Sequence, residues 1–255
     1  MSLPRPPLPR RAWLQGAGAS LGALWLSGCD RIAEDPNVVK ALSSAEVLNR
    51  RVQRLLGRGA LAREFTRADI TAAFKANGTV NPPDADYQAM AANNFVDWKL
   101  IVDGLVERPL ALSLDQIKAL PARTQITRHD CVEGWSCIGE WTGARFGALM
   151  DLAGLRPQAR HIVLYCADTL GGRKYYETLD VVDVQHPQTI LAYAMNGSPL
   201  TVAHGAPLRL RAERYLGYKQ AKYVMRLEAV DRFDHIAGGQ GGFWEDQGYD
   251  RYGGI

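Results

Sequence analysis

The greatest concentration of side chains that could do chemistry lies in one short stretch. From residue 128 the chain reads RHDCVEGWS, and WTG follows from residue 141. Cys131 can act as a thiolate, which is both a nucleophile and a metal ligand, and positive charge on Arg128 or His129 would favour that form. Free cysteine is also among the most buried residue types. The residues alone therefore leave three interpretations open: a nucleophile, a metal-ligating thiolate or a buried structural cysteine.

A second group of candidate residues lies much further along the chain. The chain reads NGSPL from residue 196, HGAPLRL from residue 204 and GYKQAK from residue 217. Arg209 offers a planar fork of donors that suits a phosphate. Lys222, with the backbone N–H groups of Gln220 and Ala221, could complete an anion-binding concavity. Alternatively, Arg209 and Lys222 are solvated strand residues, and His204 is a core histidine.

The remaining cysteines limit the kinds of metal site that the chain can form. Beyond Cys29 there are only Cys131, Cys137 and Cys166, an odd number, so at least one is outside any intrachain disulfide. The spacing of Cys131 and Cys137 fits no zinc site, and there is no C-x-x-C-H haem motif or cysteine cluster for iron and sulfur. We expect structural roles for Cys137 and Cys166, and a disulfide between them stays open.

Alternating and apolar patterns predict mostly strands around these residues. Strands are expected at 98–102, 124–128, 161–166, 190–195, 208–211 and 223–230. The strand at 124–128 leads directly to Cys131, and Asn196-Gly197 is typical of a tight hairpin turn. Short helices are expected after Ser113 and at 146–153, where Gly154 closes the second. Because strands outnumber helices and seldom alternate with them, the predicted fold class is α+β with a mixed or antiparallel sheet.

The flanking regions are less regular. A capping box at Ser43 and Glu46 predicts a helix that continues to about Leu61. Residues 66–94 are polar and rich in turn signals, which indicates a long and functional loop. The end of the chain, 238–255, is rich in Gly and aromatic residues and is predicted to wrap the surface or to be partly disordered. Its aromatic residues, Trp244 and Tyr249 among them, could cover the cleft or dock an electron-transfer partner. No internal repeat is evident.

The first residues have the order of an export signal. Arg10 and Arg11 precede a short apolar stretch at 16–26, an arrangement similar to a twin-arginine signal. Leu26-Ser-Gly-Cys29 resembles a bacterial lipobox, which would make Cys29 the lipidated first residue of the mature protein. A chance Arg-Arg pair and an ordinary signal-peptidase site are the alternatives. The predicted location is the periplasm, with a possible lipid anchor in the inner membrane.

Composition points to an ordinary globular protein with no electrostatic preference for nucleic acid. The 255 residues are 47% hydrophobic, which is ample for a core. The formal charge is +3, and loss of residues 1–28 removes three arginines and no acid, leaving zero. The predicted organisation is a signal at 1–28, a linker, helix and polar loop at 29–97, a catalytic core at 98–235 and a tail at 236–255.

The two motif blocks together resemble one family. CVEGWS with WTG is similar to the metal-binding loop of sulfite oxidase-fold molybdoenzymes, and the blocks from residues 196 to 222 resemble the NG-x-x-L, HGAPLRL and GYK-x-x-K pattern of the same family. The periplasmic catalytic subunits that reduce methionine sulfoxide in proteins are the most similar type. The resemblance implies a molybdenum–molybdopterin cofactor whose only protein sulfur ligand is Cys131.

The resemblance also implies roles for individual residues. Arg209, Gln220, Ala221 and Lys222 would hold the pterin phosphate, and His204 would lie beside the cofactor. Three further assignments are weaker: Asn77 as a pterin contact, Asp168 as a cofactor contact or a turn cap, and Glu133 as a proton relay or a salt-bridged loop residue. Arg128 and Glu133 join Cys131 as catalytic candidates.

The implied activity is a two-electron oxygen-atom transfer on an S- or N-oxide or a sulfite-like substrate. His204 stands where methionine-sulfoxide reductases carry Asn, which leaves the substrate open. A separate haem protein, a membrane b-type or soluble c-type cytochrome, would exchange the electrons. We expect the chain to lack the immunoglobulin-like dimerisation domain of sulfite-oxidising relatives and to be a monomer.

Two functions of other classes remain as alternatives. One is a cofactor-free enzyme in which His129 activates Cys131 as a nucleophile. The other is a non-catalytic lipoprotein that keeps the fold as a binding module.

Overall fold

The computed structural model describes residues 59–253 continuously, and before them residues 35–38, 40, 44, 48, 51 and 52. The chain divides into two units, Met1–Arg58 and Gly59–Ile255. The predicted export signal, Cys29 and most of the predicted helix at 43–61 lie outside the described residues. Within the part of the chain that is described, no helix has the length and apolar character needed to cross a membrane.

The first sheet of the second unit is mixed. Its strand order is β2-β1-β10-β5-β6. Strand β1 runs parallel to β10, with Ile101 opposite Arg226, and the other neighbours are antiparallel. The strands are β1 (Lys99–Gly104), β2 (Leu110–Ser113), β5 (His161–Leu170), β6 (Arg173–Asp180) and β10 (Val224–Val230). The pairing of β1 with β10 brings together segments from opposite ends of the unit.

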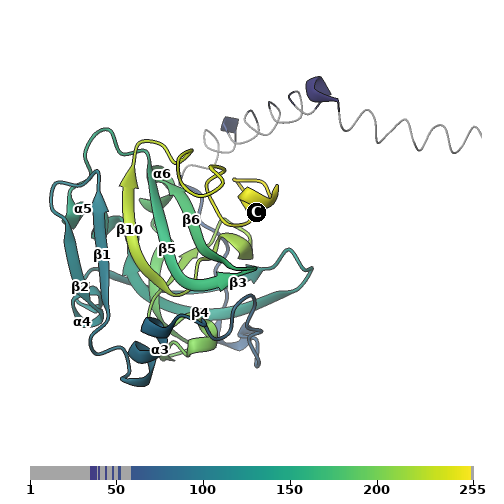
Figure 1. Ribbon diagram of the computed structural model, residues 1–255. Coiled ribbons are helices and arrows are strands. Elements are labelled where there is room, and N and C mark those ends of the chain that lie inside the picture. Colours follow the sequence, from purple (N-terminus) through teal and green to yellow (C-terminus); the bar gives the residue numbers. More distant parts are fainter. Residues whose placement is uncertain are drawn as a thin grey trace, which may run out of the picture. The chain divides into compact units, whose positions relative to one another are not determined.

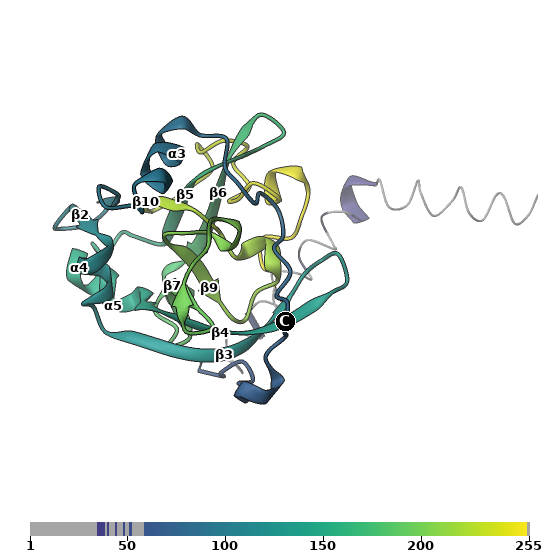
Figure 2. The same ribbon diagram turned by 90° about the horizontal axis from the view of Figure 1, so that it is seen from below.

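The second sheet is antiparallel and carries both motif blocks. Its order is β3-β4-β7-β8, and β9 pairs with β7. The hairpin of β3 and β4 runs across the direction of β5 and β10 (Figure 1), and β7 and β9 lie inside it when the molecule is seen from below (Figure 2). The strands are β3 (Ala122–Asp130), β4 (Ser136–Arg145), β7 (Thr189–Met195), β8 (Ser198–Pro199) and β9 (Arg209–Ala212).

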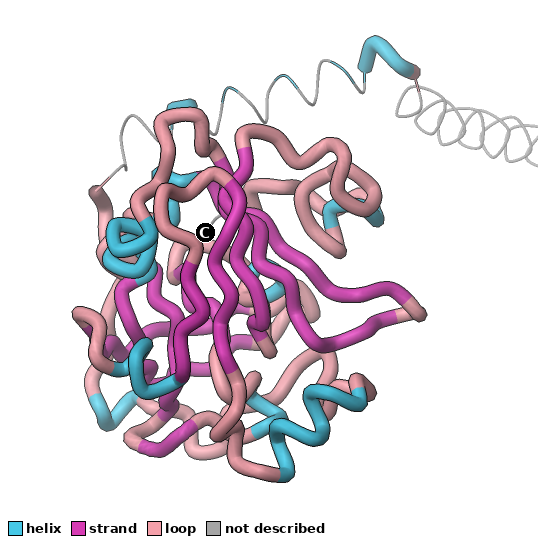
Figure 3. Tube along the Cα trace, turned by 60° about the vertical axis from the view of Figure 1, so that its left-hand side comes forward, coloured by secondary structure: helices cyan, strands magenta, loops and turns pink. Residues whose placement is uncertain are grey.

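Short helices lie at the edges of this strand-rich body (Figure 3). They are α3 (Ala85–Ala92), α4 (Leu114–Lys118), α5 (Phe146–Ala153) and α6 (Val181–Val184). Helix α5 buries Phe146, Leu149 and Met150 completely against the core. Each such side chain contributes about 1.5–3 kcal/mol when buried. The core between the sheets is therefore continuous with α5.

Most predicted elements are confirmed, and the α+β class with mixed and antiparallel sheets is correct. The capping box of Ser113 and Gln116 starts α4, Gly154 ends α5 with φ of 72°, and Asn196-Gly197 joins β7 to β8. Strands β2, β4 and β6 and helices α3 and α6 were not predicted. Helix α3 buries only Tyr87, so it has no apolar stripe to reveal it.

Strand β4 was missed because glycines interrupt its pattern. A Cβ at Gly143 would lie 2.3 Å from the carbonyl oxygen of Leu191 in the neighbouring β7. Only glycine permits this approach, where the register between β4 and β7 shifts. The WTG motif is thus part of a central strand.

Candidate active site

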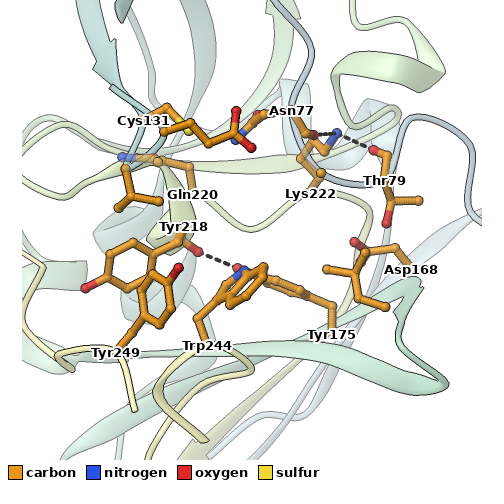
Figure 4. A pocket seen from close by; sticks show the side chains of 15 residues that line it. Asn77, Thr79, Cys131, Asp168, Tyr175, Tyr218, Gln220, Lys222, Trp244 and Tyr249 are labelled. Atoms are coloured by element: carbon orange, nitrogen blue, oxygen red, sulfur yellow. Dashed lines mark hydrogen bonds between the residues drawn. The ribbon is translucent and has the colours of Figure 1, made fainter. Parts of the chain in front are cut away.

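A pocket of about 160 Å³ opens where the two motif blocks meet. Figure 4 shows Cys131 and Asn77 on one side of it and a group of aromatic side chains on the other. Its lining comes from five separate parts of the chain: Asn77, Gly78, Thr79, Cys131, Val132, Glu133, Asp168, Leu170, Tyr175, Gly217, Tyr218, Gln220, Lys222, Trp244 and Tyr249. Six of the predicted site residues therefore share one cavity.

Cys131 is presented by the loop that joins β3 to β4. Its backbone N–H donates to the carbonyl of Trp135 (2.9 Å), and its carbonyl accepts from Gly134 N–H (3.0 Å). Gly134 has φ of 82°, which a glycine adopts without strain. The side chain is half-buried in the pocket wall, and the thiol is free. The loop is a short, hydrogen-bonded turn that fixes the thiol at the cavity.

Glu133 lies at the exposed rim of the same loop. Its carboxylate accepts from Trp135 Nε1 (2.8 Å) and lies 3.6 Å from Lys75 Nζ. The hydrogen bond from Trp135, followed by the charge of Lys75, lowers the pKa of Glu133 below its ordinary value. Glu133 is therefore ionised at neutral pH and forms a salt bridge with Lys75, while its role as a proton relay stays a prediction.

Near its end, strand β3 points Arg128 and His129 in opposite directions. Arg128 is exposed and donates from Nε to Asp130 (2.9 Å), outside the pocket. His129 is only 2% exposed. Burial, followed by the charge of Arg211, lowers the pKa of His129 to about 2. Arg128 therefore lies outside the pocket, and its catalytic role stays a prediction, whereas His129 is neutral and does not supply the positive charge expected beside Cys131.

The neutral imidazole of His129 has one unused donor. Its Nδ1 accepts from Arg211 Nη1 at 2.9 Å, so Nε2 carries the proton. Among the described residues that nitrogen has no hydrogen-bond partner. It faces Gly217 of the pocket lining, where a Cβ would lie only 2.7 Å away.

Arg209, at the start of β9, is a buried cation without a counter-ion. It is 2% exposed, packs 4.8 Å above the Trp141 ring and donates from Nη1 to the carbonyl of His204 (3.0 Å). No described carboxylate lies within salt-bridge distance of it, and its Nε has no partner. Burial, followed by Arg211, lowers the pKa of Arg209 to about 9. Arg211, on the same Trp141 ring at 4.5 Å, differs because Glu213 neutralises it.

Lys222 uses its ammonium group to hold the loop on the other side of the pocket. It donates to the carbonyls of Asn77 (2.7 Å), Thr79 and Ala203 (3.0 Å). Burial, followed by the charge of Arg209, lowers the pKa of Lys222 to about 7. Lys222 thus links Asn77 to the second motif block rather than projecting as an unbound cation.

The other predicted cofactor contacts have local partners. Gln220 N–H and Ala221 N–H donate to the carbonyls of Gly217 and Lys219, so they do not form an open anion cradle. His204 Nε2–H donates to the Phe74 carbonyl (3.2 Å), and its Nδ1 accepts from Thr201 Oγ1 (2.9 Å). These three residues surround the site without offering it a free donor in this arrangement.

Asp168 lies in β5 with its side chain in the pocket. It is 4% exposed, and its Oδ1 has no partner among the described residues. Burial raises the pKa of Asp168 to about 6, although Lys222 opposes the change. Asp168 does not cap a turn; it is a pocket carboxylate that faces the Lys222 side.

The described residues hold no group of three or more His, Cys, Asp or Glu that could bind a metal ion. Cys131, Cys137 and Cys166 are all free, and the latter two are buried. A metal at Cys131 would therefore need most of its ligands from a cofactor.

Comparison with known proteins places this site in a family. The sequence profile described as "Oxidoreductase molybdopterin binding domain" matches residues 87–235, more than half of the chain. A protein from Azospira oryzae, provisionally named a protein-methionine-sulfoxide reductase subunit, YedZ1, is 37% identical over 96% of this chain and 87% of its own length. The chain belongs to the molybdopterin-binding oxidoreductase family.

Other relatives match shorter stretches. The uncharacterized oxidoreductase YuiH of Bacillus subtilis is 32% identical over 61% of this chain and 74% of its own length. The protein-methionine-sulfoxide reductase catalytic subunit MsrP of Xanthomonas campestris is 31% identical, and the match spans 61% of this chain and half of that protein. The sulfane dehydrogenase SoxCD of Paracoccus pantotrophus has a TM-score of 0.49 at 24% identity, covering 54% of this chain and 39% of that one.

The donors of the site fit a molybdopterin. The cofactor has a phosphate, and the buried Arg209 has a positive charge with no carboxylate partner and an unused Nε–H. His129 Nε2 and Trp141 Nε1 are two further buried nitrogens without partners. Three buried donors without acceptors would each cost free energy unless a ligand supplied the acceptors. Of these donors, Arg209 lies in the block where the sequence predicts the phosphate site, and His129 and Trp141 lie in the first motif block.

Proposed function

We propose that this protein is an exported molybdenum-dependent oxidoreductase that transfers an oxygen atom from a neutral organic S- or N-oxide, with Cys131 as the protein ligand of the metal. The observation that carries the proposal is a free, half-buried thiol in a pocket shared with the second motif block. When bound, the molybdenum supplies the two-electron redox change that oxygen-atom transfer requires.

The chain's own residues would bind and orient the cofactor. Arg209 would pair with the phosphate, and His129 Nε2–H would donate a hydrogen bond without changing charge, since its pKa lies far below neutral pH. Lys222 holds the Asn77 loop at the pocket edge. The thiolate of Cys131 suits a sulfur-rich metal environment.

The charges of the pocket favour a neutral substrate over sulfite. Glu133 and Asp168 are two carboxylates in the lining, and the only described cation of the lining, Lys222, already donates to three carbonyls. An anionic substrate would be repelled by the buried carboxylate of Asp168, whereas Glu133 is exposed, paired with Lys75 and adds little. A sulfoxide carries no net charge and needs only a hydrogen-bond donor, so the reductase names of the relatives agree with this preference.

Electron transfer and location complete the proposal. A separate haem protein would deliver electrons one at a time, which agrees with the subunit names of two relatives. The twin-arginine and lipobox sequences support export to the periplasm and an anchor at Cys29. We also propose that the protein acts as a monomer.

The first experiment compares Cys131→Ser with Cys137→Ser in protein from molybdate-supplied cells. Both cysteines are free, but only Cys131 lines the pocket. Wild type and Cys137→Ser should contain stoichiometric molybdenum and reduce sulfoxides with a dye donor, and Cys131→Ser should lose the activity and most of the metal. Folded wild type without molybdenum or pterin would overturn the proposal.

The same proteins separate the two alternatives. Rapid alkylation of Cys131 in metal-free wild type, with an activity that alkylation abolishes, would indicate a nucleophilic cysteine. Metal-free protein without any such activity would indicate a binding module.

A further inference from the structure

The C-terminal residues 238–253 form an ordered wrap that reaches the pocket. Phe243 N–H donates to the carbonyl of Tyr176 (3.0 Å), and Leu216 N–H donates to that of Gly253 (2.7 Å). Asp246 accepts from Tyr176 OH (2.8 Å) and from Gly238 N–H (2.9 Å). These contacts attach the segment at several points, so its side chains have fixed positions.

Four aromatic side chains form one side of the pocket, here called the aromatic wall: Tyr175, Tyr218, Trp244 and Tyr249. The ring of Tyr249 lies 5.2 Å from that of Tyr218 and 5.1 Å from that of Trp244. Figure 4 shows this group across the cavity from Cys131. Tyr249 is 40% exposed, whereas Tyr175 and Tyr218 are buried. The wall therefore presents aromatic faces at the mouth of the pocket.

A buried ionic group stands behind the wall. Lys219 forms salt bridges with Glu177 and Glu245, and the three side chains are 0–1% exposed. Lys219 adjoins Tyr218, and Glu245 adjoins Trp244. Gly242 lies so close to both carboxylates that a Cβ would overlap Glu245 Oε2. The wrap is thus joined to the second motif block directly beneath the aromatic wall.

The hydroxyl groups of Tyr175 and Tyr218 are already hydrogen-bonded to backbone carbonyls. Tyr218 OH donates to the carbonyl of Asp250 (2.5 Å), and Tyr175 OH donates to the carbonyl of Tyr218. Tyr175 and Tyr218 therefore offer a ligand mainly ring surface, and Trp244 and Tyr249 add two further rings to the lining. Ring surface binds apolar groups and makes favourable contacts with sulfur. The polar groups of the pocket are on the Cys131 side.

We propose that Trp244 and Tyr249 bind the organic substituent of the oxide substrate and thereby determine its preference for bulky apolar S-oxides. The inference rests on the proposed function. The oxide end would face Cys131, and the substituent would lie against the rings of the wall. Neither residue was identified as a site residue from the sequence.

The test uses molybdenum-loaded wild type, Trp244→Ala and Tyr249→Ala, with Tyr252→Ala as the control. Tyr252 belongs to the same wrap but packs on Tyr215 and does not line the pocket. Reduction of methyl p-tolyl sulfoxide is compared with that of dimethyl sulfoxide, using a viologen donor. Loss of wall contacts should lower kcat/KM for the aryl substrate by about tenfold or more, since pocket contacts of this size discriminate by that factor. The change for dimethyl sulfoxide and for Tyr252→Ala should stay within about threefold.

Binding of methyl p-tolyl sulfone, which carries the same ring and has no turnover here, provides an independent readout by calorimetry. Weaker sulfone binding in Trp244→Ala and Tyr249→Ala, with unchanged molybdenum, supports the wall whether or not wild type reduces sulfoxides. Wild type that binds the sulfone but reduces no oxide would overturn the proposed function alone. Equal losses for both sulfoxides, or sulfone affinity unchanged in both wall variants, would overturn the proposed role of the wall.

Discussion

The two sides of the pocket are built in opposite ways. The Cys131 side is a short turn closed by two backbone hydrogen bonds, and its next two side chains, Val132 and Glu133, are exposed. The side formed by the second motif block and the wrap rests on a fully buried lysine and two buried glutamates. Backbone hydrogen bonds within one turn hold the first side. Salt bridges between residues far apart in the sequence hold the second.

This difference separates the energetic roles of the two sides. Charged groups at the Cys131 rim are hydrated and contribute little to folding. The buried group contributes through the cost of leaving any one of its charges unpaired. Substitutions of the same type on the two sides should therefore have very different effects on stability.

The largest expected effect is that of Lys219→Met. It leaves two glutamates buried without their ammonium partner, which should lower the free energy of unfolding by about 3–5 kcal/mol. Lys75→Met is the matched change on the Cys131 side, where the pair with Glu133 is more than half exposed, and should cost less than about 1 kcal/mol. Urea unfolding of both variants measures the contrast. Similar losses of stability in the two variants would show that the buried and the exposed ion pairs contribute equally to folding.

Arg209→Met should change cofactor content and stability in opposite directions. Loss of the phosphate contact should reduce bound pterin by about tenfold or more, as expected for a charge-assisted hydrogen bond. The cofactor-free variant should unfold at a higher temperature than cofactor-free wild type, because a buried unpaired cation has been removed. Pterin fluorescence and calorimetry provide the two measurements, and Arg128→Met is the exposed control. A lower unfolding temperature would contradict the description of Arg209 as uncompensated.

Glu177→Gln tests the buried side through pH. Burial raises the pKa of Glu177 well above 4.5, and Lys219 only partly opposes this. A raised folded-state pKa stabilises the protein below the ordinary value, and the stabilisation is lost as pH rises through the folded value. Wild type should therefore lose stability relative to Glu177→Gln as pH rises from about 4.5 towards neutral. Parallel urea midpoints across that range would refute the raised pKa.

The smallest effect is expected for Glu133→Gln. The side chain is exposed and keeps its acceptor for Trp135, so stability should change by less than about 0.5 kcal/mol. Thermal unfolding checks this, with Glu245→Gln as the buried counterpart. A large loss of stability in Glu133→Gln would mean that this exposed side chain contributes substantially to the free energy of unfolding.

Local patterns were sufficient for most of the fold. The alternation in β3, the apolar face of α5 and the Asn196-Gly197 turn are each encoded by neighbouring residues. Strand β4 could not be recognised in this way, since Gly143 is explained by the approach of Leu191 from a distant strand. The short polar helix α3 is fixed by the Asp84 cap and the burial of Tyr87, not by periodicity.

The site was predictable only where chemistry follows a motif. Cys131 and Lys222 were found because their blocks are distinctive, although the assignment of roles within the site stays a prediction. The sequence could have shown that Arg128 points away from Cys131. Side chains alternate along a strand, so His129, and not Arg128, shares a face with Cys131. Trp244 and Tyr249 stood out only as part of an aromatic tail that could cover the cleft, and nothing in the sequence showed that Glu245 pairs with the distant Lys219.

The parallel pair of β1 and β10 has a consequence for how the molecule is made. Ile101 meets Arg226 only after more than a hundred intervening residues have been synthesised, and those residues include both Cys131 and Arg209. Contacts of such long sequence separation slow folding, because chain entropy is lost before they form. This pair of strands can therefore form only after residue 226 has been synthesised. Before that pairing forms, Cys131 and Arg209 are not yet held together by the closed sheet. A large rigid ligand can enter the site during this interval more easily than after the sheet has closed.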